Sequence, residues 1–370
     1  MINSVYVARL ADLLAEYCVS VKEGDEVVYS STYEALPLAL EVVRAVVTRG
    51  GYPIARITDE LLAEVFYKYA PESVLKYVPK VERFIMENAD ALINVLSSTH
   101  TKYLASVDPA KIKIASSARK ELTEIFMKRS AEGSLKWVVV AYPTKALAQE
   151  AGMSFSEYAD FVFKAEKVDK EDPVSEWKKQ AEFQAKVADF LSKVSELHFV
   201  GPNMDIKFRV DGRKWVNDDG KHNMPGGEIF TAPIEDSAEG FIEFTYPAIW
   251  RGREVEGVVL RFEKGVVVEA KARRGEEFLK KMLETDEGAK RVGELAFGLN
   301  YSVTKFTKSI LFDEKIGGTI HIALGAAYPE CGGRNVSAIH WDMVRDMKDS
   351  KVYADGDLVY ENGKFIVEVL

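Results

Sequence analysis

The stretch GDEVVYSSTYEALPLALEVVRAVVTRGGYPIARIT, residues 24–58, decides the fold class of the first half of the chain. Its opening segment GDEVVYS (24–30) is predicted to form a buried strand. Residues 34–51 have the apolar spacing of a helix that stops at Gly50-Gly51, and residues 52–58 follow as a second strand. A strand, a helix and a strand in this order form a βαβ unit.

Two further apolar segments extend this pattern. ADALINVLSS (89–98) and KWVVVAYPT (136–144) are continuous apolar strands separated by helical patterns, as a parallel sheet covered on both faces requires. The first half is therefore predicted to be α/β with a mainly parallel sheet. Its strand-to-helix turns contain neither a GxGxxG nor a GxxxxGK signature, so no dinucleotide or P-loop site is expected there.

The pattern changes after a long helix, which is predicted to begin at Asp172-Pro173 and to run to about residue 197. Short strands with turns between them follow this helix: DIKFRV, GFIEFTYPAIW, EVEGVVLRFEKGVVVEAKA, TIHIALG, AIHWDMV and a closing hairpin DGDLVYENGKFIVEV. The sequence thus predicts an α/β domain over residues 1–197, which includes the bridging helix, and a mainly antiparallel β (α+β) domain over residues 198–370.

Composition argues against several classes of partner. A net charge of −9 over 370 residues argues against a nucleic-acid surface. Cys18 and Cys331, the two cysteines of the sequence, are too far apart for a disulfide framework or a zinc knuckle and indicate a reducing, cytoplasmic interior. No apolar run approaches the roughly 20 residues of a membrane span. The N-terminal segment VYVARLADLLAEYCVS is an amphipathic helix and no signal peptide.

A high share of charged residues, 29%, combined with three glutamines favours a thermophilic source.

The stretch AIHWDMV (338–344) places a histidine and an aspartate in an apolar run. In an extended strand, alternate side chains share a face, so His340 and Asp342 lie on one face and Trp341 and Met343 on the other. His321 in TIHIALG repeats this arrangement. An isolated HxD is most often a satisfied polar pair, but two imidazoles on polar strand faces beside a carboxylate indicate a metal site.

Two glutamates in glycine-marked, low-charge settings supply further ligand types. Glu228 lies in NMPGGEIFTAP and Glu294 in RVGELAFG. An unpaired carboxylate buried in such a setting would be costly. Each glutamate by itself could equally be a satisfied turn residue, but together with the two histidines they indicate a metal site. Zinc, cobalt and manganese accept mixed sets of imidazole and carboxylate ligands, and a hydrolytic site uses additional carboxylates to bridge two divalent ions.

These segments resemble the M29 metallo-aminopeptidases, the family of aminopeptidase T and aminopeptidase S. GGEIFTAP, GAKRVGELA, DEKIGGTIHIALGAAY and HWD follow the family motifs in order and at similar spacing. One departure is Lys315, which follows Asp313-Glu314 where many members have an asparagine and which affects the expected conformation of this loop. The resemblance implies these metal ligands: Glu228, Glu294, His321, His340 and Asp342, with Tyr328 beside the metals as a catalytic residue or weak ligand.

The function that follows is a metal-dependent aminopeptidase, which releases N-terminal residues from peptides by means of water activated by two divalent ions. In this interpretation Glu294 transfers the proton and Tyr328 donates to the oxyanion. The resemblance also implies a homodimer. Asp313 and Glu314 are left out of the ligand set, because two explanations fit them equally well: partners that orient His321 from outside the ligand set, or a solvated turn. Cys331 is expected to be an incidental thiol.

Two alternatives remain from the residues alone. One is a mononuclear Fe(II) oxygenase, since HxD with a distant histidine is the content of a facial triad. However, the second histidine of that class usually follows HxD, and no histidine follows His340. The other alternative is a non-catalytic protein with a structural metal, although structural sites favour thiolates over carboxylates.

Overall fold

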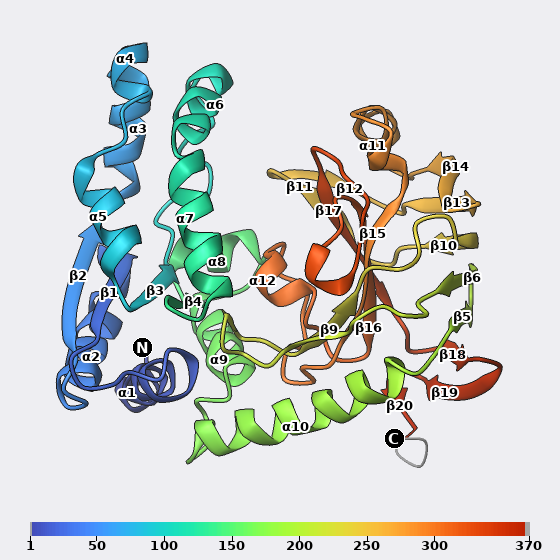
Figure 1. Cartoon of the computed structure of the whole chain (residues 1–370), viewed down its shortest axis with the longest axis horizontal. Coiled ribbons are helices and arrows are strands. Elements are labelled where there is room, and N and C mark those ends of the chain that lie inside the picture. The colour runs from blue at the N-terminus through green and yellow to red at the C-terminus, as the bar shows by residue number, and fades with distance from the viewer. Residues whose placement is uncertain (1, 367–370) are drawn as a thin grey trace. The chain divides into compact units, whose positions relative to one another are not determined.

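The computed structural model describes residues 2–366, which form two compact units. One unit comprises Met1–Glu176 with Gly220–Pro225, and the other comprises Trp177–Asp219 with Gly226–Leu370. Figure 1 shows that the first unit is rich in helices and the second in strands. The division between them falls inside helix α10 (Pro173–Leu191).

The first unit is built on a parallel sheet with the strand order β2-β1-β3-β4-β8. Every pairing between these neighbours is parallel. The strands are β1 (Glu26–Thr32), β2 (Tyr52–Thr58), β3 (Ala91–Leu96), β4 (Lys136–Ala141) and β8 (Asn223–Met224). The prediction of an α/β first half with a mainly parallel sheet is therefore confirmed.

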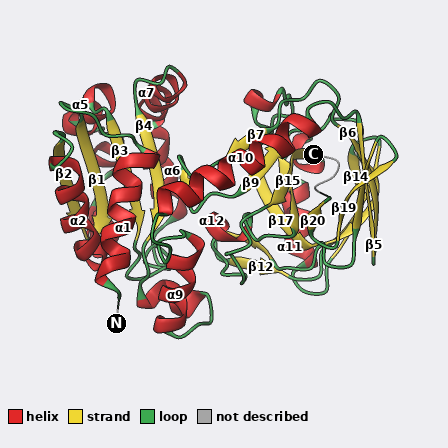
Figure 2. Ribbon diagram, turned by 90° about the horizontal axis from the view of Figure 1, so that it is seen from below, coloured by secondary structure: helices red, strands yellow, loops and turns green. Residues whose placement is uncertain are grey.

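Helices lie on both faces of this sheet (Figure 2). Helices α5 and α7 contribute Ile85, Met86 and Phe126 to a cluster with the strand residues Val28 and Leu92. The helices of this unit are α1 (Ser4–Leu13), α2 (Leu36–Val47), α3 (Glu60–Tyr69), α4 (Glu72–Leu75), α5 (Lys80–Asn88), α6 (Pro109–Ala118), α7 (Lys120–Ala131), α8 (Lys145–Glu150) and α9 (Phe155–Ala165). Burial of both sheet faces explains why β1 and β3 are continuous apolar runs.

The second unit contains a larger antiparallel sheet with the strand order β14-β13-β10-β6-β5-β18-β19-β20. Its strands are β5 (Glu196–Gly201), β6 (Met204–Arg209), β10 (Glu239–Glu243), β13 (Val259–Glu263), β14 (Val266–Lys271), β18 (Lys351–Ala354), β19 (Asp357–Glu361) and β20 (Lys364–Phe365). A small ribbon pairs β11 (Ala248–Trp250) with β12 (Arg253–Val255). Two short helices belong to this unit, α11 (Glu276–Leu283) and α12 (Ile310–Asp313).

A smaller antiparallel sheet has the strand order β17-β16-β15-β9-β7. Its strands are β7 (Val216–Asp218), β9 (Glu228–Thr231), β15 (Val292–Gly298), β16 (Thr319–Gly325) and β17 (His340–Asp346). With the larger sheet, it confirms the prediction that the second half is mainly antiparallel.

One apolar core joins the two sheets of the second unit. Phe199 and Phe208 of the larger sheet and Phe297 and Ile320 of the smaller sheet belong to the same buried cluster. The rings of Phe199 and Phe297 stack with their centroids 5.8 Å apart. One face of the smaller sheet is therefore occupied by the core, which leaves its other face for polar side chains.

Helix α10 ends earlier than the sequence predicted. The helix stops at Leu191, and residues from Glu196 onward form strand β5. Leu197 and Phe199 are fully buried in the core and pair with β6, so packing in the sheet outweighs a helical pattern that would otherwise continue. Within residues 2–366, none of the helices combines the length and apolarity that crossing a membrane requires.

Candidate metal centre

The five side chains that the resemblance implies as metal ligands come together on one face of the smaller sheet. They belong to strands β17, β16, β15 and β9, which are successive neighbours in that sheet. The set, called the five-residue cluster below, is Glu228, Glu294, His321, His340 and Asp342. Strands that are far apart in the sequence thus supply one site.

Strand register explains why these side chains share a face. Glu294 pairs with Ala323, and Ala323 pairs with Asp342. Residues paired directly across an antiparallel sheet point to the same side. His321 lies two residues before Ala323 and is therefore on that side as well. The same alternation applies to His340, which lies two residues before Asp342.

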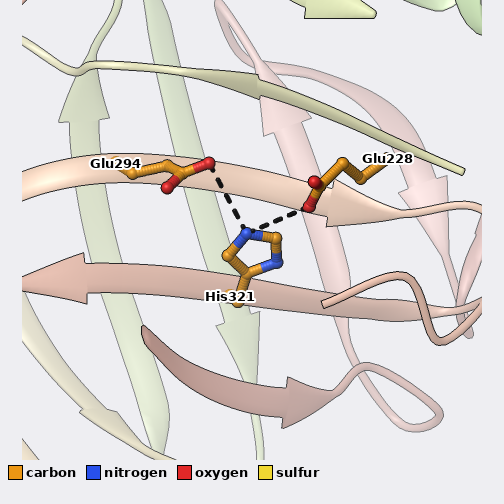
Figure 3. A group of neighbouring side chains, drawn as sticks. All are labelled: Glu228, Glu294 and His321. Carbon is orange, nitrogen blue, oxygen red and sulfur yellow. Dashed lines mark ion pairs between the residues drawn. The ribbon is translucent and has the colours of Figure 1, made fainter. Parts of the chain in front are cut away.

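His321 lies between the two glutamates of the cluster. Its Nε2 is 3.3 Å from Glu228 Oε2 and 3.6 Å from Glu294 Oε1. Figure 3 shows both carboxylates pointing toward this ring nitrogen from neighbouring strands. All three residues are buried, with His321 at 0% exposure and each glutamate at 4%. Two carboxylates and one imidazole are thus held together away from bulk water.

His340 lies on the more open side of the cluster. Its Nε2 is 3.0 Å from Glu294 Oε2 and 3.5 Å from Asp342 Oδ1. Its Nδ1 is 2.8 Å from the carbonyl oxygen of Ala326. Because a carbonyl can only accept, Nδ1 carries the proton in neutral His340, and the lone pair of Nε2 points at the carboxylates.

Several polar atoms of the cluster lack a hydrogen-bond partner among the described residues. They are Glu228 Oε2, both ring nitrogens of His321, and Asp342 Oδ1. A buried polar group without a partner is costly, so a native site with several such groups requires an explanation. A divalent cation fits, since imidazole nitrogen and carboxylate oxygen are the donors that zinc, cobalt and manganese accept.

Three combinations of side chains bring one ligand atom each within 4.8 Å of one another. They are Glu228–Glu294–His321, Glu294–His340–Asp342 and Glu314–His321–Asp342. Glu294, His321 and Asp342 each belong to two combinations. Of these three, the carboxylates of Glu294 and Asp342 have two oxygens each and could bridge neighbouring ions.

The cluster shifts the protonation of its own members. Burial raises the pKa of Glu294, but the close contacts and charges of His321 and His340 outweigh it and bring the value to about 2. Burial lowers the pKa of His321, but Glu294 and Glu228 raise it to about 9. Asp342 and Glu294 likewise overcome burial and raise the pKa of His340 to about 11. Without metal, protons therefore occupy the imidazoles.

Tyr328 lies beside the cluster on the segment that follows β16. Its ring centroid is 5.0 Å from that of His340, in an edge-to-face arrangement, and 5.2 Å from that of Phe230. Although Tyr328 is 39% exposed, its partial burial, followed by the charges of Glu294 and Asp342, raises the pKa of its hydroxyl. The phenol therefore keeps its proton and can act as a hydrogen-bond donor.

Two charged residues join the cluster that were not expected there. Glu314, left out of the ligand set at the sequence level, is close enough to His321 and Asp342 to share an ion with them. Lys315, the departure from the family motif, has its Nζ 2.8 Å from both Glu228 Oε1 and Glu314 Oε2. The signal in the sequence was the charged run DEK (313–315), which ends shortly before the histidine strand begins at Thr319.

Other candidates take structural roles. Asp313 is 2% exposed and accepts hydrogen bonds from Thr307 N and Oγ1 at 2.7 Å and 3.0 Å, so it does not form a solvated turn. Cys331 is a buried free thiol, and burial raises its pKa to about 12, which leaves it a poor nucleophile. The Nε2 atom of His198 lies 2.7 Å from Asp205 Oδ1, and the ring of His222 stacks on the ring of Trp137.

A cavity of about 350 Å³ opens beside the cluster. His340 and Asp342 form part of its wall, and most of the remainder is apolar. Apolar side chains of the wall include Ile249, Trp250, Phe306, Ile310 and Val344. A group bound near the cluster can therefore extend an apolar side chain into this space.

Comparison with known proteins identifies the family to which the chain belongs. A family model described as thermophilic metalloprotease (M29) matches residues 4–365. Aminopeptidase T of Thermus aquaticus is 31% identical over an alignment that covers 87% of this chain and 85% of that protein.

Two solved structures share the fold. One is wild-type AmpT from Thermus thermophilus, with a TM-score of 0.83, 26% identity, and coverage of 98% of this chain and 99% of that chain. The other is 2,5-dihydroxypyridine dioxygenase from Pseudomonas putida KT2440, with a TM-score of 0.64, 15% identity, and coverage of 99% and 98%. At that identity the second likeness concerns the fold alone.

Proposed function

Because the chain belongs to the M29 family and is a metallo-aminopeptidase, we propose that it releases N-terminal residues from peptides with two divalent ions held in the five-residue cluster. The observation that carries this proposal is the set of overlapping ligand combinations. Since Glu294 is common to two of them, one ion is proposed at Glu294–His340–Asp342 and another on the side of Glu228 and His321. Residues 198–370 are proposed as the catalytic domain.

When bound, such ions supply Lewis acidity, which lowers the pKa of water and polarises a carbonyl group. The proton of the attacking water then needs an acceptor. Glu294 is proposed for this role, since its carboxylate reaches both His321 and His340 and its lowered pKa keeps it ionised. Glu294 would afterwards deliver the proton to the leaving amine.

Tyr328 is proposed as the donor to the oxygen of the scissile carbonyl. Its hydroxyl stays protonated because its pKa is raised, and its ring is held against His340 and Phe230. As charge develops on the carbonyl oxygen in the tetrahedral state, a fixed O–H donor stabilises that state more than the substrate.

The carboxylates of the site suit a substrate with a free amino terminus. Glu228, Glu314 and Asp342 lie in the same group of acidic side chains as Glu294. A protonated α-amino group can pair with one of them, which would fix the first peptide bond at the site. The apolar cavity beside His340 is proposed to receive the side chain of the first residue.

Zinc, cobalt or manganese is proposed as the metal, because mixed carboxylate and imidazole ligands suit all three. A cytoplasmic location and a homodimer are also proposed. The location is supported by Cys18 and Cys331, which are buried and form no disulfide in the described part of the chain, as fits a reducing compartment. The dimer is supported by the family resemblance alone and can be checked by sedimentation.

The oxygenase alternative is disfavoured by the composition of the ligand combinations. A facial triad needs two histidines and one carboxylate. Among the described residues, each of the three combinations holds one histidine and two carboxylates. A hydrolytic site, with carboxylates that bridge ions and accept protons, fits this composition better.

The experiment that tests the proposal combines chelation with metal analysis. Exhaustive removal of divalent ions should abolish hydrolysis of an unblocked leucyl peptide, and cobalt, zinc or manganese should restore it. Elemental analysis of the reactivated protein should give two ions per chain. Full activity in a preparation verified to be metal-free would refute the proposal.

A further inference from the structure

A buried ammonium lies inside the acidic site. Lys315 Nζ is 2.8 Å from Glu228 Oε1, 2.8 Å from Glu314 Oε2 and 3.7 Å from Asp218 Oδ2. The side chain of Lys315 is 2% exposed. At such burial, charge interactions are screened far less than at the surface.

The backbone holds Lys315 in place. Its carbonyl oxygen accepts a hydrogen bond from Asn300 N at 3.0 Å, and its own N–H donates to Phe312 O at 3.0 Å. The turn before Lys315 is held by Asp313, whose carboxylate accepts hydrogen bonds from Thr307 N and Oγ1. The ammonium is therefore a built part of the site and not the end of a surface side chain.

Lys315 contacts the two sides of the site unequally. Glu228 and Glu314, which it pairs with, belong to the combinations Glu228–Glu294–His321 and Glu314–His321–Asp342. Its ion pairs among the described residues do not extend to the third combination, Glu294–His340–Asp342. One cation position is thus free of the ammonium, while the other must share carboxylate oxygens with it.

We propose that Lys315 makes the two metal positions unequal, so that the ion at Glu294–His340–Asp342 binds tightly and the ion on the side of Glu228 and Glu314 binds weakly and exchanges. This inference rests on the proposed two-ion function. It adds that the activity is regulated by the occupancy of the weaker position. Two causes act together: the ammonium occupies Glu228 Oε1 and Glu314 Oε2, and it repels a nearby divalent cation.

Formal charge supports this division of roles. The carboxylates of the site are those of Asp218, Glu228, Glu294, Glu314 and Asp342. Their charge is balanced by two divalent ions together with the ammonium of Lys315. Without Lys315 the site would keep a surplus negative charge and would hold its second ion more tightly. With Lys315, activity should follow the concentration of free metal, because the weakly held ion is lost first.

The test is a titration of the metal-free full chain with Mn²⁺, followed by calorimetry, for the wild type and Lys315→Met. Methionine keeps the length of the side chain and removes its charge. We expect two binding steps in the wild type, and in Lys315→Met a dissociation constant for the second step that is lower by about tenfold or more. The first step should change by less than about threefold.

Two further variants complete the design. Lys351→Met removes another lysine that is paired with a carboxylate, Glu361 at 3.0 Å, but lies in β18 outside the site, and should titrate as the wild type does. Lys315→Gln is used if Lys315→Met does not fold, as judged by circular dichroism. A second step that is equally weak in the wild type and the folded Lys315 variant would overturn the inference.

The outcomes separate this inference from the proposed function. Two ions of equal affinity in both proteins, with peptide hydrolysis intact, would overturn the inference and leave the function standing. One ion in both proteins would overturn the two-ion part of the function, and with it the inference that rests on two positions.

Discussion

The Nδ1 atom of His340 lies 2.8 Å from the carbonyl oxygen of Ala326, which belongs to the segment after the neighbouring strand β16. This contact fixes the orientation of the imidazole and directs its Nε2 at Glu294, 3.0 Å away. Because the Ala326 carbonyl already holds the His340 ring in place, the imidazole needs little reorientation when it binds a metal ion.

Glu294→Gln should lose activity while it keeps its fold. The amide is nearly isosteric with the carboxylate but cannot accept the proton of water, so kcat should fall by about 10²- to 10⁴-fold. Steady-state kinetics and circular dichroism measure the two effects. Glu263→Gln, a change in an exposed glutamate of β13, is the matched control. An unchanged kcat in Glu294→Gln would assign proton transfer to another residue.

Tyr328→Phe should lower kcat and leave KM nearly unchanged. The substitution removes the hydroxyl but keeps the ring contacts with His340 and Phe230. Loss of an oxyanion donor costs about 10²- to 10³-fold in kcat when that donor is the main one. A rise in KM with kcat unchanged would mean that Tyr328 binds the substrate and does not stabilise the tetrahedral state.

N-acetylated peptides should be inert. The acetyl group removes the positive charge and the lone pair by which the amino terminus can engage the carboxylates or an ion. Mass spectrometry of a timed digest should show unblocked peptides shortening one residue at a time from the N-terminus. Comparable cleavage of the capped peptide, or internal fragments that appear first, would contradict the assignment as an aminopeptidase.

Substrates with bulky apolar first residues should be preferred over glycyl substrates. Ile310 is 51% exposed and lines the cavity beside His340 and Asp342. Ile310→Ala should lower kcat/KM for leucyl peptides by about 3- to 30-fold, through lost apolar contact, and leave glycyl peptides unaffected. Val268→Ala, on β14 and outside the cavity lining, serves as control. Equal losses for both substrates would rule out a role in side-chain selection.

The thermal stability of the metal-free protein should fall as the pH rises from about 6.5 toward 9 and beyond. Neighbouring carboxylates raise the pKa of His321 to about 9 and of His340 to about 11, against the effect of burial. A raised histidine pKa stabilises the folded state fully below the unfolded value of about 6.5. This stabilisation is lost as the pH passes through the folded values.

At acidic pH the thermal stability of the metal-free protein should instead fall as the pH is lowered. The pKa of Glu294, lowered to about 2, contributes stability above the ordinary glutamate value, and this contribution is lost as the pH falls toward 2. Calorimetric scans in chelator and in Mn²⁺ would separate these effects, because ligation requires neutral imidazoles. Parallel pH profiles with and without metal would contradict the prediction.

Much of the architecture could be read from the sequence because its signals are local. The βαβ pattern of residues 24–58 and the apolar runs near residues 91–96 and 136–141 predicted the parallel sheet, since a strand covered on both faces must be apolar throughout. The alternation in TIHIALG likewise predicted a strand with His321 on the face opposite Ile320 and Ile322. Each of these signals is contained within a single element.

Strand register and the loop before β16 were decided only by the tertiary structure. The pairings Glu294 with Ala323 and Ala323 with Asp342 set the row of side chains across the sheet, and no single segment encodes them. For the same reason the sequence did not predict that Glu314 lies near His321, or that Lys315 enters the site. Both follow a one-turn helix, and the hydrogen bond from Asn300 to the Lys315 carbonyl determines where they lie. A charge beside a motif can be read from the chain, but its burial among other charges depends on contacts between distant segments.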